Sequence, residues 1–244
     1  MKKIKNPTAC IIIIGNEILS GRTIDTNKNY LCKELNIKGI DVIEARVIKD
    51  NIKHIIDTVN QTRKKYDYIF TTGGIGPTHD DLTALSIAKA FKVKLVKNKK
   101  AIQILKKYYS SMKQPLNESR EKMAFMPQGS QILYNPITKA AGFRIKNVFV
   151  MAGIPEIMIA MFKNIIKKIK HGTPEISKTI LINSSETIIA RDLFKIQNEF
   201  KEVEIGSYPF YTKTKKGVDI VLRSKNKNQI KQVANKIRNI IKFL

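Results

Sequence analysis

Over its first 170 residues, the chain alternates short apolar runs with longer stretches in which apolar residues recur every three or four positions. The run 9–14 (ACIIII) is continuously apolar, which is typical of a strand buried on both faces of a parallel sheet. Strands that alternate with helices imply parallel crossovers, so we predict an α/β fold, a three-layer α/β/α domain with a mostly parallel sheet. The predicted strands are 9–14, 41–47, 68–72, 131–134, 143–145 and 148–151, and the predicted helices are 26–35, 52–63, 82–91, 99–109, 118–123 and 155–170.

A polar break at 171–174 (HGTP) predicts a linker, after which the pattern changes. A βαββα order follows, and it predicts a small α+β domain in which the helices pack on one face of an antiparallel-rich sheet. We therefore expect two domains, 1–171 and 175–244. In the second domain, strands are predicted at 178–182, 203–208 and 217–223, and helices at 186–199 and 229–241.

The formal net charge of +25 over 244 residues raises the question of nucleic-acid binding. Only eight of the 45 basic residues are arginine, the basic residues are scattered, and aromatic residues are not interleaved with them as a stacking platform requires. Nucleic acid is therefore not an expected partner. A positive field instead favours encounter with anionic small molecules.

No apolar run reaches the roughly 18 residues that a membrane span needs. The N-terminus also lacks a signal-peptide pattern, so we expect a cytoplasmic protein without a membrane partner. Cys10 and Cys32 have no second cysteine or histidine at metal-ligand spacing. Both are interpreted as small buried hydrophobes, which disfavours a disulfide framework and a structural zinc site.

The segment 71–83 (TTGGIGPTHDDLT) carries the strongest functional signal. Its glycines, Gly73, Gly74 and Gly76, stand between a predicted strand and a predicted helix. Backbone N–H groups and the positive end of a helix dipole gather at such a junction, so we expect the three glycine amides to bind a phosphate or carboxylate. Asp80 and Asp81 precede the helix and either hold a bridging divalent cation or only cap the helix.

Other acids follow other predicted strands, with Glu17 after the first strand and Asp50 after the second. Ligands bind beyond the carboxyl ends of the strands in an open parallel sheet, so these acids can converge with those of the glycine loop. Together they would hold a cation that in turn holds a phosphate, the chemistry of pyrophosphate cleavage or nucleotidyl transfer. The structural alternative is that Asp25 and Asp50 cap helices and that Glu17 caps its own loop.

His79 lies at the mouth of the glycine loop, where an imidazole could donate to a phosphate or act as an acid. A solvent-exposed bystander is the alternative interpretation. Neither Ser20 nor the pair Ser184 and Ser185 has a G-x-S-x-G context, so a serine nucleophile is not predicted.

Four motifs are informative together: 15–22 (GNEILSGR) followed by Asn27, then 71–83, 139–143 (KAAGF) and 153–156 (GIPE). They resemble the MoaB/Mog-type molybdopterin-binding domain of the CinA (competence/damage-inducible protein A) family, whose relatives include the N-terminal domain of FAD synthase. A weaker resemblance continues at 204–210 (EIGSYPF). The resemblance implies a three-layer α/β fold with a small second domain, homo-oligomeric assembly, and a nucleotide or pterin phosphate in the glycine loop.

The two functional aspartates of the Mog pattern correspond to Asp50 and Asp81, which we predict as catalytic residues. Asp80 and Asp81 are the predicted metal ligands. The predicted ligand-binding positions are Glu17, Ser20, Asn27, Thr72, Gly73, Gly74, Gly76, Thr78, His79, Lys139, Gly142, Gly153 and Pro155.

CinA-type domains imply metal-dependent hydrolysis, with Mg²⁺, Mn²⁺ or Co²⁺, of a nucleotide pyrophosphate such as ADP-ribose or FAD. Mog-type relatives instead adenylylate molybdopterin, so a molybdopterin adenylyltransferase and a non-catalytic module that binds a pterin or nucleotide are the alternatives. Asn16 stands where the family usually has Asp, which removes a candidate metal ligand and favours the binding module. The long form of CinA has a C-terminal deamidase domain that this sequence lacks, so nicotinamide-nucleotide deamidation is not expected.

Overall fold

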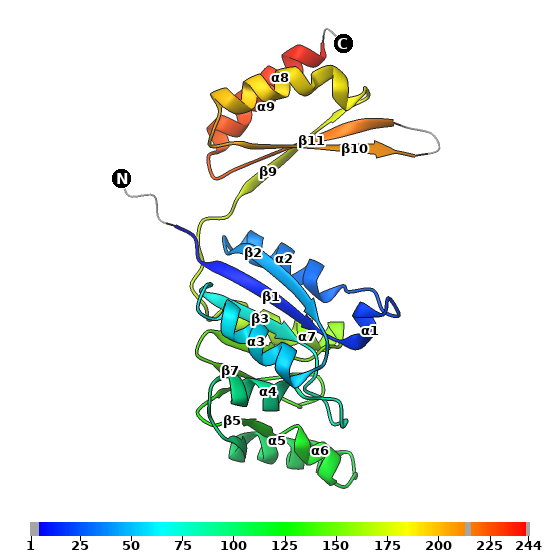
Figure 1. The fold of residues 1–244 in the computed structure, drawn as a ribbon, viewed down its shortest axis with the longest axis vertical. Coiled ribbons are helices and arrows are strands. Elements are labelled where there is room, and N and C mark those ends of the chain that lie inside the picture. The colour runs from blue at the N-terminus through cyan, green and yellow to red at the C-terminus, as the bar shows by residue number, and fades with distance from the viewer. Residues whose placement is uncertain (1–4, 213–215, 243–244) are drawn as a thin grey trace. The chain divides into compact units, whose positions relative to one another are not determined.

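The computed structural model describes residues 5–212 and 216–242. The chain divides into two compact units, Met1–Gly172 and Thr173–Leu244 (Figure 1). Two hydrophobic clusters form the core of the first unit, and a third cluster forms the core of the second.

A six-stranded sheet forms the centre of the first unit. In spatial order its strands are β2 (Asp41–Ile48), β1 (Thr8–Ile14), β3 (Tyr68–Thr72), β8 (Val148–Met151), β7 (Gly142–Ile145) and β6 (Gln131–Leu133). The first four strands pair in parallel, whereas β7 and β6 are antiparallel at one edge. The sheet is therefore mostly parallel, as predicted.

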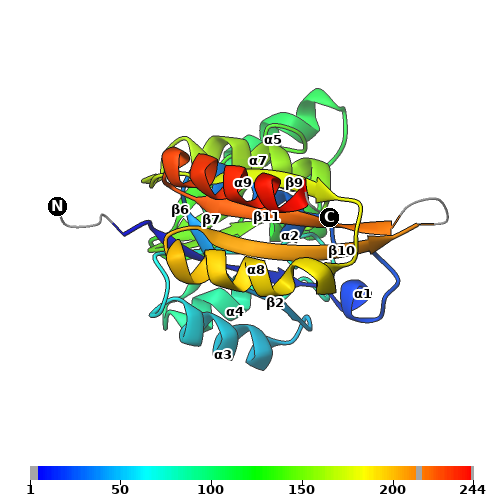
Figure 2. The ribbon, with the colours of Figure 1, turned by 90° about the horizontal axis from the view of Figure 1, so that it is seen from above.

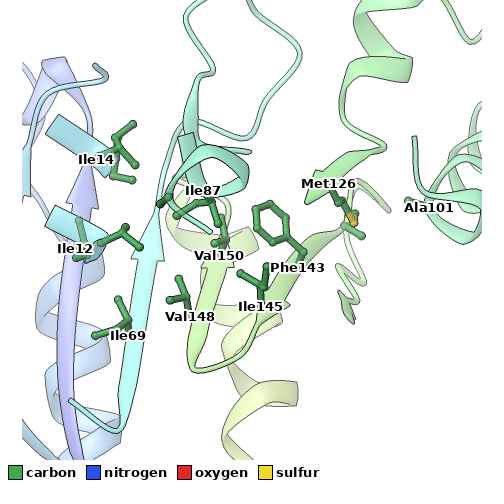
Figure 3. Packing of buried hydrophobic residues seen from close by; sticks show 14 of the residues in the cluster. Ile12, Ile14, Ile69, Ile87, Ala101, Met126, Phe143, Ile145, Val148 and Val150 are labelled. Atoms are coloured by element: carbon green, nitrogen blue, oxygen red, sulfur yellow. The ribbon is translucent and has the colours of Figure 1, made fainter. Parts of the chain in front are cut away.

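Helices cover both faces of this sheet and complete the predicted three layers (Figures 1 and 2). They are α2 (Asn27–Ile37) and α7 (Pro155–Ile166) on one face, and α3 (Ile52–Thr62), α4 (Thr83–Ala90) and α5 (Lys99–Ser111) on the other. In β1, Ile11 and Ile13 join the cluster of α2 and α7, while Ile12 and Ile14 join the opposite cluster, which Figure 3 shows. The prediction that β1 is buried on both faces is thus confirmed.

Four short elements complete the first unit: α1 (Asn16–Leu19), β4 (Leu95–Lys97), α6 (Glu118–Lys122) and β5 (Phe125–Pro127). β4 and β5 pair as a small antiparallel sheet. Of these four elements, only α6 is predicted from the sequence. The predicted helix 155–170 is too long, since α7 ends at Ile166 and Ile169 packs against the core from a turn beyond it.

The second unit has the predicted βαββα order: β9 (Ile176–Ile182), α8 (Glu186–Glu199), β10 (Glu204–Tyr211), β11 (Lys216–Ser224) and α9 (Lys227–Ile241). Its strands form an antiparallel sheet in the order β10-β11-β9. Both helices lie on one face of this sheet, where Leu193 of α8 and Val233 of α9 share a core with Val218 of β11 (Figure 2). The small α+β arrangement is therefore confirmed. Among the residues described in either unit, no helix is both long enough and apolar enough to cross a bilayer.

Candidate functional site

The loop between β3 and α4 is shaped by two glycines in the left-handed region of backbone conformation, Gly73 (φ 103°) and Gly74 (φ 66°). A Cβ atom at Gly73 would collide with the carbonyl oxygen of Ile14, and one at Gly74 would collide with Thr83 Oγ1. Both the backbone angle and the available space therefore require glycine at these positions. The loop consequently turns close against the carboxyl end of β1.

Three hydrogen bonds hold this turn. Thr83 donates its N–H to Gly74 O (2.9 Å) and its hydroxyl to Gly73 O (2.9 Å). Gly73 donates its own N–H to Met151 O (3.2 Å), so this amide is not a free donor for a phosphate. Among the hydrogen bonds that the structure describes, none uses the amides of Gly74 and Gly76, which leaves these two of the three expected donors.

Asp81 folds back onto the same loop. Its Oδ2 accepts hydrogen bonds from Thr78 N (2.8 Å) and Thr78 Oγ1 (2.5 Å). A Cβ at Gly76 would lie 2.7 Å from the same oxygen, so glycine makes room for the carboxylate. Lys122 at the end of α6 donates a hydrogen bond to Thr78 O and so links α6 to the glycine loop. Asp81 therefore stabilises the turn in addition to any role toward a ligand.

Asp50 lies beside the glycines at the end of β2. Its Oδ1 would be 2.8 Å from a Cβ at Gly74, and this oxygen is buried without a hydrogen-bond partner. Burial is the largest cause that raises the pKa of Asp50 from 3.8 to about 6, followed by the negative charges of Glu17, Asp81 and Asp80. Folding thus holds a carboxylate where its charge is disfavoured, which is typical of functional sites.

The capping alternatives for the two isolated aspartates have different outcomes. Asn51, not Asp50, caps α3, because its side chain accepts from Lys53 N (3.0 Å) and His54 N (3.2 Å). Asp25 does have a structural partner at the start of α2, since it accepts from Lys28 N (3.0 Å). Asp50 therefore does not cap α3, although it accepts a hydrogen bond from the backbone N–H of Asn16 at the start of α1.

One cavity of about 550 Å³ connects these groups. Because Asp50 and Asp81 line the same cavity, the structure places the two predicted catalytic residues together. The predicted site residues along its wall are Glu17, Asp50, Gly73, Gly74, Gly76, Thr78, Asp80, Asp81 and Gly153. The volume falls within the range of roughly 300–1,000 Å³ that is usual for small-molecule sites.

Three further predicted positions are buried: Asn27, Thr72 and Gly142. Asn27 donates its Nδ2 to Gly153 O (2.6 Å) and so ties the start of α2 to the loop after β8. Thr72 is buried in β3. Gly142 is buried in β7, where a Cβ would collide with Val150 O. None of these three residues lines the cavity.

The remaining predicted positions also lie outside the cavity wall. Ser20 donates its hydroxyl to Glu17 O (3.1 Å) at the end of α1. The Lys139 ammonium group donates hydrogen bonds to Tyr134 Oη (2.9 Å) and Pro136 O (2.7 Å). Its positive charge is therefore engaged within its own loop. His79 is exposed, and Pro155 is exposed in the first turn of α7.

Four wall residues carry no sequence signal: Tyr109, Met123, Asn135 and Thr138. Asn135 shapes the loop after β6, since its Nδ2 donates to Thr138 Oγ1 (2.6 Å) and Ala140 O (3.0 Å). Tyr109 and Met123 come from the segment that contains α5 and α6. Only the fold brings these residues to the glycine loop, because none belongs to a motif with recognisable chemistry.

The carboxylates of the cavity suit a hard divalent cation such as Mg²⁺, which takes oxygen ligands. The unpartnered, buried Oδ1 of Asp50 is a suitable ligand atom. Within residues 5–212 and 216–242, however, no three Asp, Glu, His or Cys side chains are close enough to form a complete metal site. The residues therefore fit a cation that one or two carboxylates share with the phosphates of a ligand, as Mg²⁺ is commonly held.

A mostly parallel α/β domain with a glycine loop and acids at its strand ends defines a MoaB/Mog-like class of protein. Residues 10–171 match a family model described as "probable molybdopterin binding domain", and residues 174–242 match the middle domain of FAD synthase. The chain belongs to the molybdopterin-binding-domain family and, within it, to the CinA-like proteins.

Individual relatives agree with this assignment. A protein of Archaeoglobus fulgidus is 36% identical over 199 residues, which cover 82% of this chain and 84% of the relative. A "CinA-like protein" of Desulfosudis oleivorans is 37% identical over 157 residues, and the match spans 63% of this chain but 38% of that protein. The crystal structure of CinA from Thermoplasma acidophilum, titled as a protein with unknown function, has a TM-score of 0.61 and 32% identity. The match covers 66% of this chain and 97% of the CinA chain in that structure.

We predict that Gly74→Ala destabilises the protein more than Gly129→Ala does. Both glycines have positive φ (66° and 80°), but nothing lies within 4 Å of a Cβ at Gly129. The Gly129 variant should lose about 1 kcal/mol of unfolding free energy for its backbone angle. The Gly74 variant should lose about 2 kcal/mol more, because its methyl group meets Thr83 and Asp50. Equal losses in urea unfolding would contradict the described packing.

We also predict that Asp50→Asn stabilises the fold above pH 7. The folded-state pKa of about 6 lies above the ordinary 3.8, so the penalty for the charged form is present above pH 6 and absent below about pH 4. The shift corresponds to roughly 3 kcal/mol, and discounting for solvent screening leaves a gain of about 1–2 kcal/mol at pH 8. Urea unfolding at pH 8 and pH 4 measures it, with exposed Asp57→Asn as the control. A gain that is equal at both pH values is the contrary result.

Proposed function

We propose that the chain binds a nucleotide pyrophosphate in the cavity and hydrolyses it with the help of a divalent cation. The observation that carries this proposal is the shared cavity of Asp50 and Asp81, closed on one side by the glycine loop. The charged residues along the described cavity wall are all acids, so an anionic ligand there would need a cation to offset their charge. ADP-ribose and FAD are the substrates to test first.

The amides of Gly74 and Gly76 would donate hydrogen bonds to phosphate oxygens. Their positions are fixed by the bonds from Thr83 to Gly73 O and Gly74 O, so these donors do not need to reorganise during the reaction. Thr78 and Asp81 brace the other end of the turn. Preorganised donors of this kind stabilise charge that develops on the transferred phosphorus group.

Asp50 and Asp81 would hold the cation, with Asp80 and Glu17 in support. When bound, the cation would neutralise phosphate charge and activate a water molecule. A cation also relieves the repulsion among these acids, because Asp50 has an unpartnered oxygen and three acidic neighbours. The folded cavity thus has a negative potential that would favour a bound cation.

We expect the purified protein to release AMP from ADP-ribose or FAD in the presence of Mg²⁺, Mn²⁺ or Co²⁺. Asp50→Asn and Asp81→Asn should each lower kcat by about 100-fold or more, because each removes charge that positions the cation. Asp57→Asn, an exposed change on α3, should leave kcat unchanged. Chromatographic detection of AMP measures all three.

A loss of activity in Asp50→Asn cannot be attributed to unfolding if this variant is also more stable at neutral pH. Wild-type protein that releases no AMP with any of the three metals would remove the hydrolase proposal.

Molybdopterin adenylyl transfer is the second candidate, because residues 10–171 match the molybdopterin-binding family. Incubation with ATP and the pterin distinguishes it, since this activity forms an adenylylated pterin and releases pyrophosphate. A binding module without catalysis is favoured by Asn16 and would bind ligand tightly, with no turnover and no effect of Asp81→Asn on affinity.

A further inference from the structure

We propose that Tyr109 forms a stacking site for the planar heterocycle of the ligand whose phosphates lie at the glycine loop. This inference rests on the proposed function, since it concerns the same cavity and names the part of the ligand that the loop does not bind. The class of ligand is a phosphate or pyrophosphate ester that carries a nitrogen heterocycle, such as a purine, flavin or pterin. Tyr109 belongs to α5 and to none of the motifs that define the family resemblance.

The cavity has two kinds of wall. Its charged residues are all acids, Glu17, Asp50, Asp80 and Asp81, and they come from α1 and the loops after β2 and β3. The other residues along the described wall are uncharged, and Tyr109 of α5 is the one aromatic side chain among them. A ligand with a charged end and an apolar, flat end matches this division, because each end meets the surface that suits it.

The ring of Tyr109 is held in place before any ligand arrives. The guanidinium carbon of Arg120 lies over the ring, 4.2 Å from its centroid. Arg120 is itself fixed, since its Nη1 donates to Pro115 O (2.6 Å) and its Nη2 to Gln114 Oε1 (2.7 Å). Gln114 in turn donates its N–H to Tyr109 O (3.0 Å). This closed set of contacts makes Arg120 the positioning residue for the ring.

A fixed aromatic ring offers stacking at a low entropic cost. Tyrosine has few side-chain torsions to restrain, and its face accepts any planar base without a specific hydrogen-bond pattern. Tyr109 also packs against the core cluster that contains Leu105 and Met126, which limits its freedom further. The geometry therefore points to recognition of ring shape rather than of one particular base.

Calorimetry with AMP, FMN and ribose 5-phosphate, each in the presence of Mg²⁺, tests the inference on the full chain. Ribose 5-phosphate keeps the phosphate and lacks the heterocycle. The wild-type protein should bind AMP or FMN at least about 10-fold more tightly than ribose 5-phosphate. Tyr109→Leu should weaken AMP and FMN binding about 10-fold and leave ribose 5-phosphate binding unchanged. Tyr109→Phe should retain the wild-type affinity for AMP and FMN.

Tyr211→Leu is the matched control, because Tyr211 is an exposed tyrosine of β10 that does not line the cavity. It should leave the ratio of affinities unchanged, and Arg120→Gln should lower the ratio less than Tyr109→Leu does. The inference is overturned if neither AMP nor FMN binds more tightly than ribose 5-phosphate, or if Tyr109→Leu weakens all ligands equally. These binding ratios need no turnover, so a failed hydrolysis assay alone removes the reaction and leaves the stacking site standing.

Discussion

The close approach of Gly73 to the carbonyl oxygen of Ile14 is the contact on which the candidate site depends. It brings the loop after β3 directly against the end of β1. On the other side, a Cβ at Gly153 would lie 3.2 Å from Gly73 Cα, so the loop after β8 meets the same glycine. Because β1, β3 and β8 are neighbours in a parallel arrangement, their carboxyl ends share one edge of the sheet. Any side chain at position 73 would push these strand ends apart and with them the wall of the cavity.

The electrostatics of the cavity oppose folding and favour binding. Burial and three nearby carboxylates both disfavour the charged form of the Asp50 carboxyl, and both raise its pKa. Burial of the two hydrophobic clusters on either side of β1 offsets the free-energy cost of this buried charge. A cation bound at these carboxylates would offset their repulsion, and its binding would then be coupled to the stability of the loop.

The sequence predicts most of the fold because long apolar periods decide the longer elements. The run at 9–14 is buried on both faces, and the glycine loop and the acids at strand ends are visible as motifs. It cannot predict which strand lies beside β3, and therefore cannot show that the Gly73 amide is taken by Met151. It also cannot show that Arg120 covers Tyr109, because the intervening chain must turn back before the two side chains meet. Contacts made by tertiary structure, and the three short elements α1, β4 and β5, account for what the patterns miss.

The adjacent residues Asp50 and Asn51 divide two tasks that one aspartate could have combined. Asn51 caps α3, whereas Asp50 lines the cavity and accepts a hydrogen bond from the backbone N–H of Asn16. Under the proposed function, a substitution at position 50 would change the chemistry of the cavity while the Asn51 cap of α3 stays in place. An enzyme and a non-catalytic binding protein with this fold would then differ by one side chain.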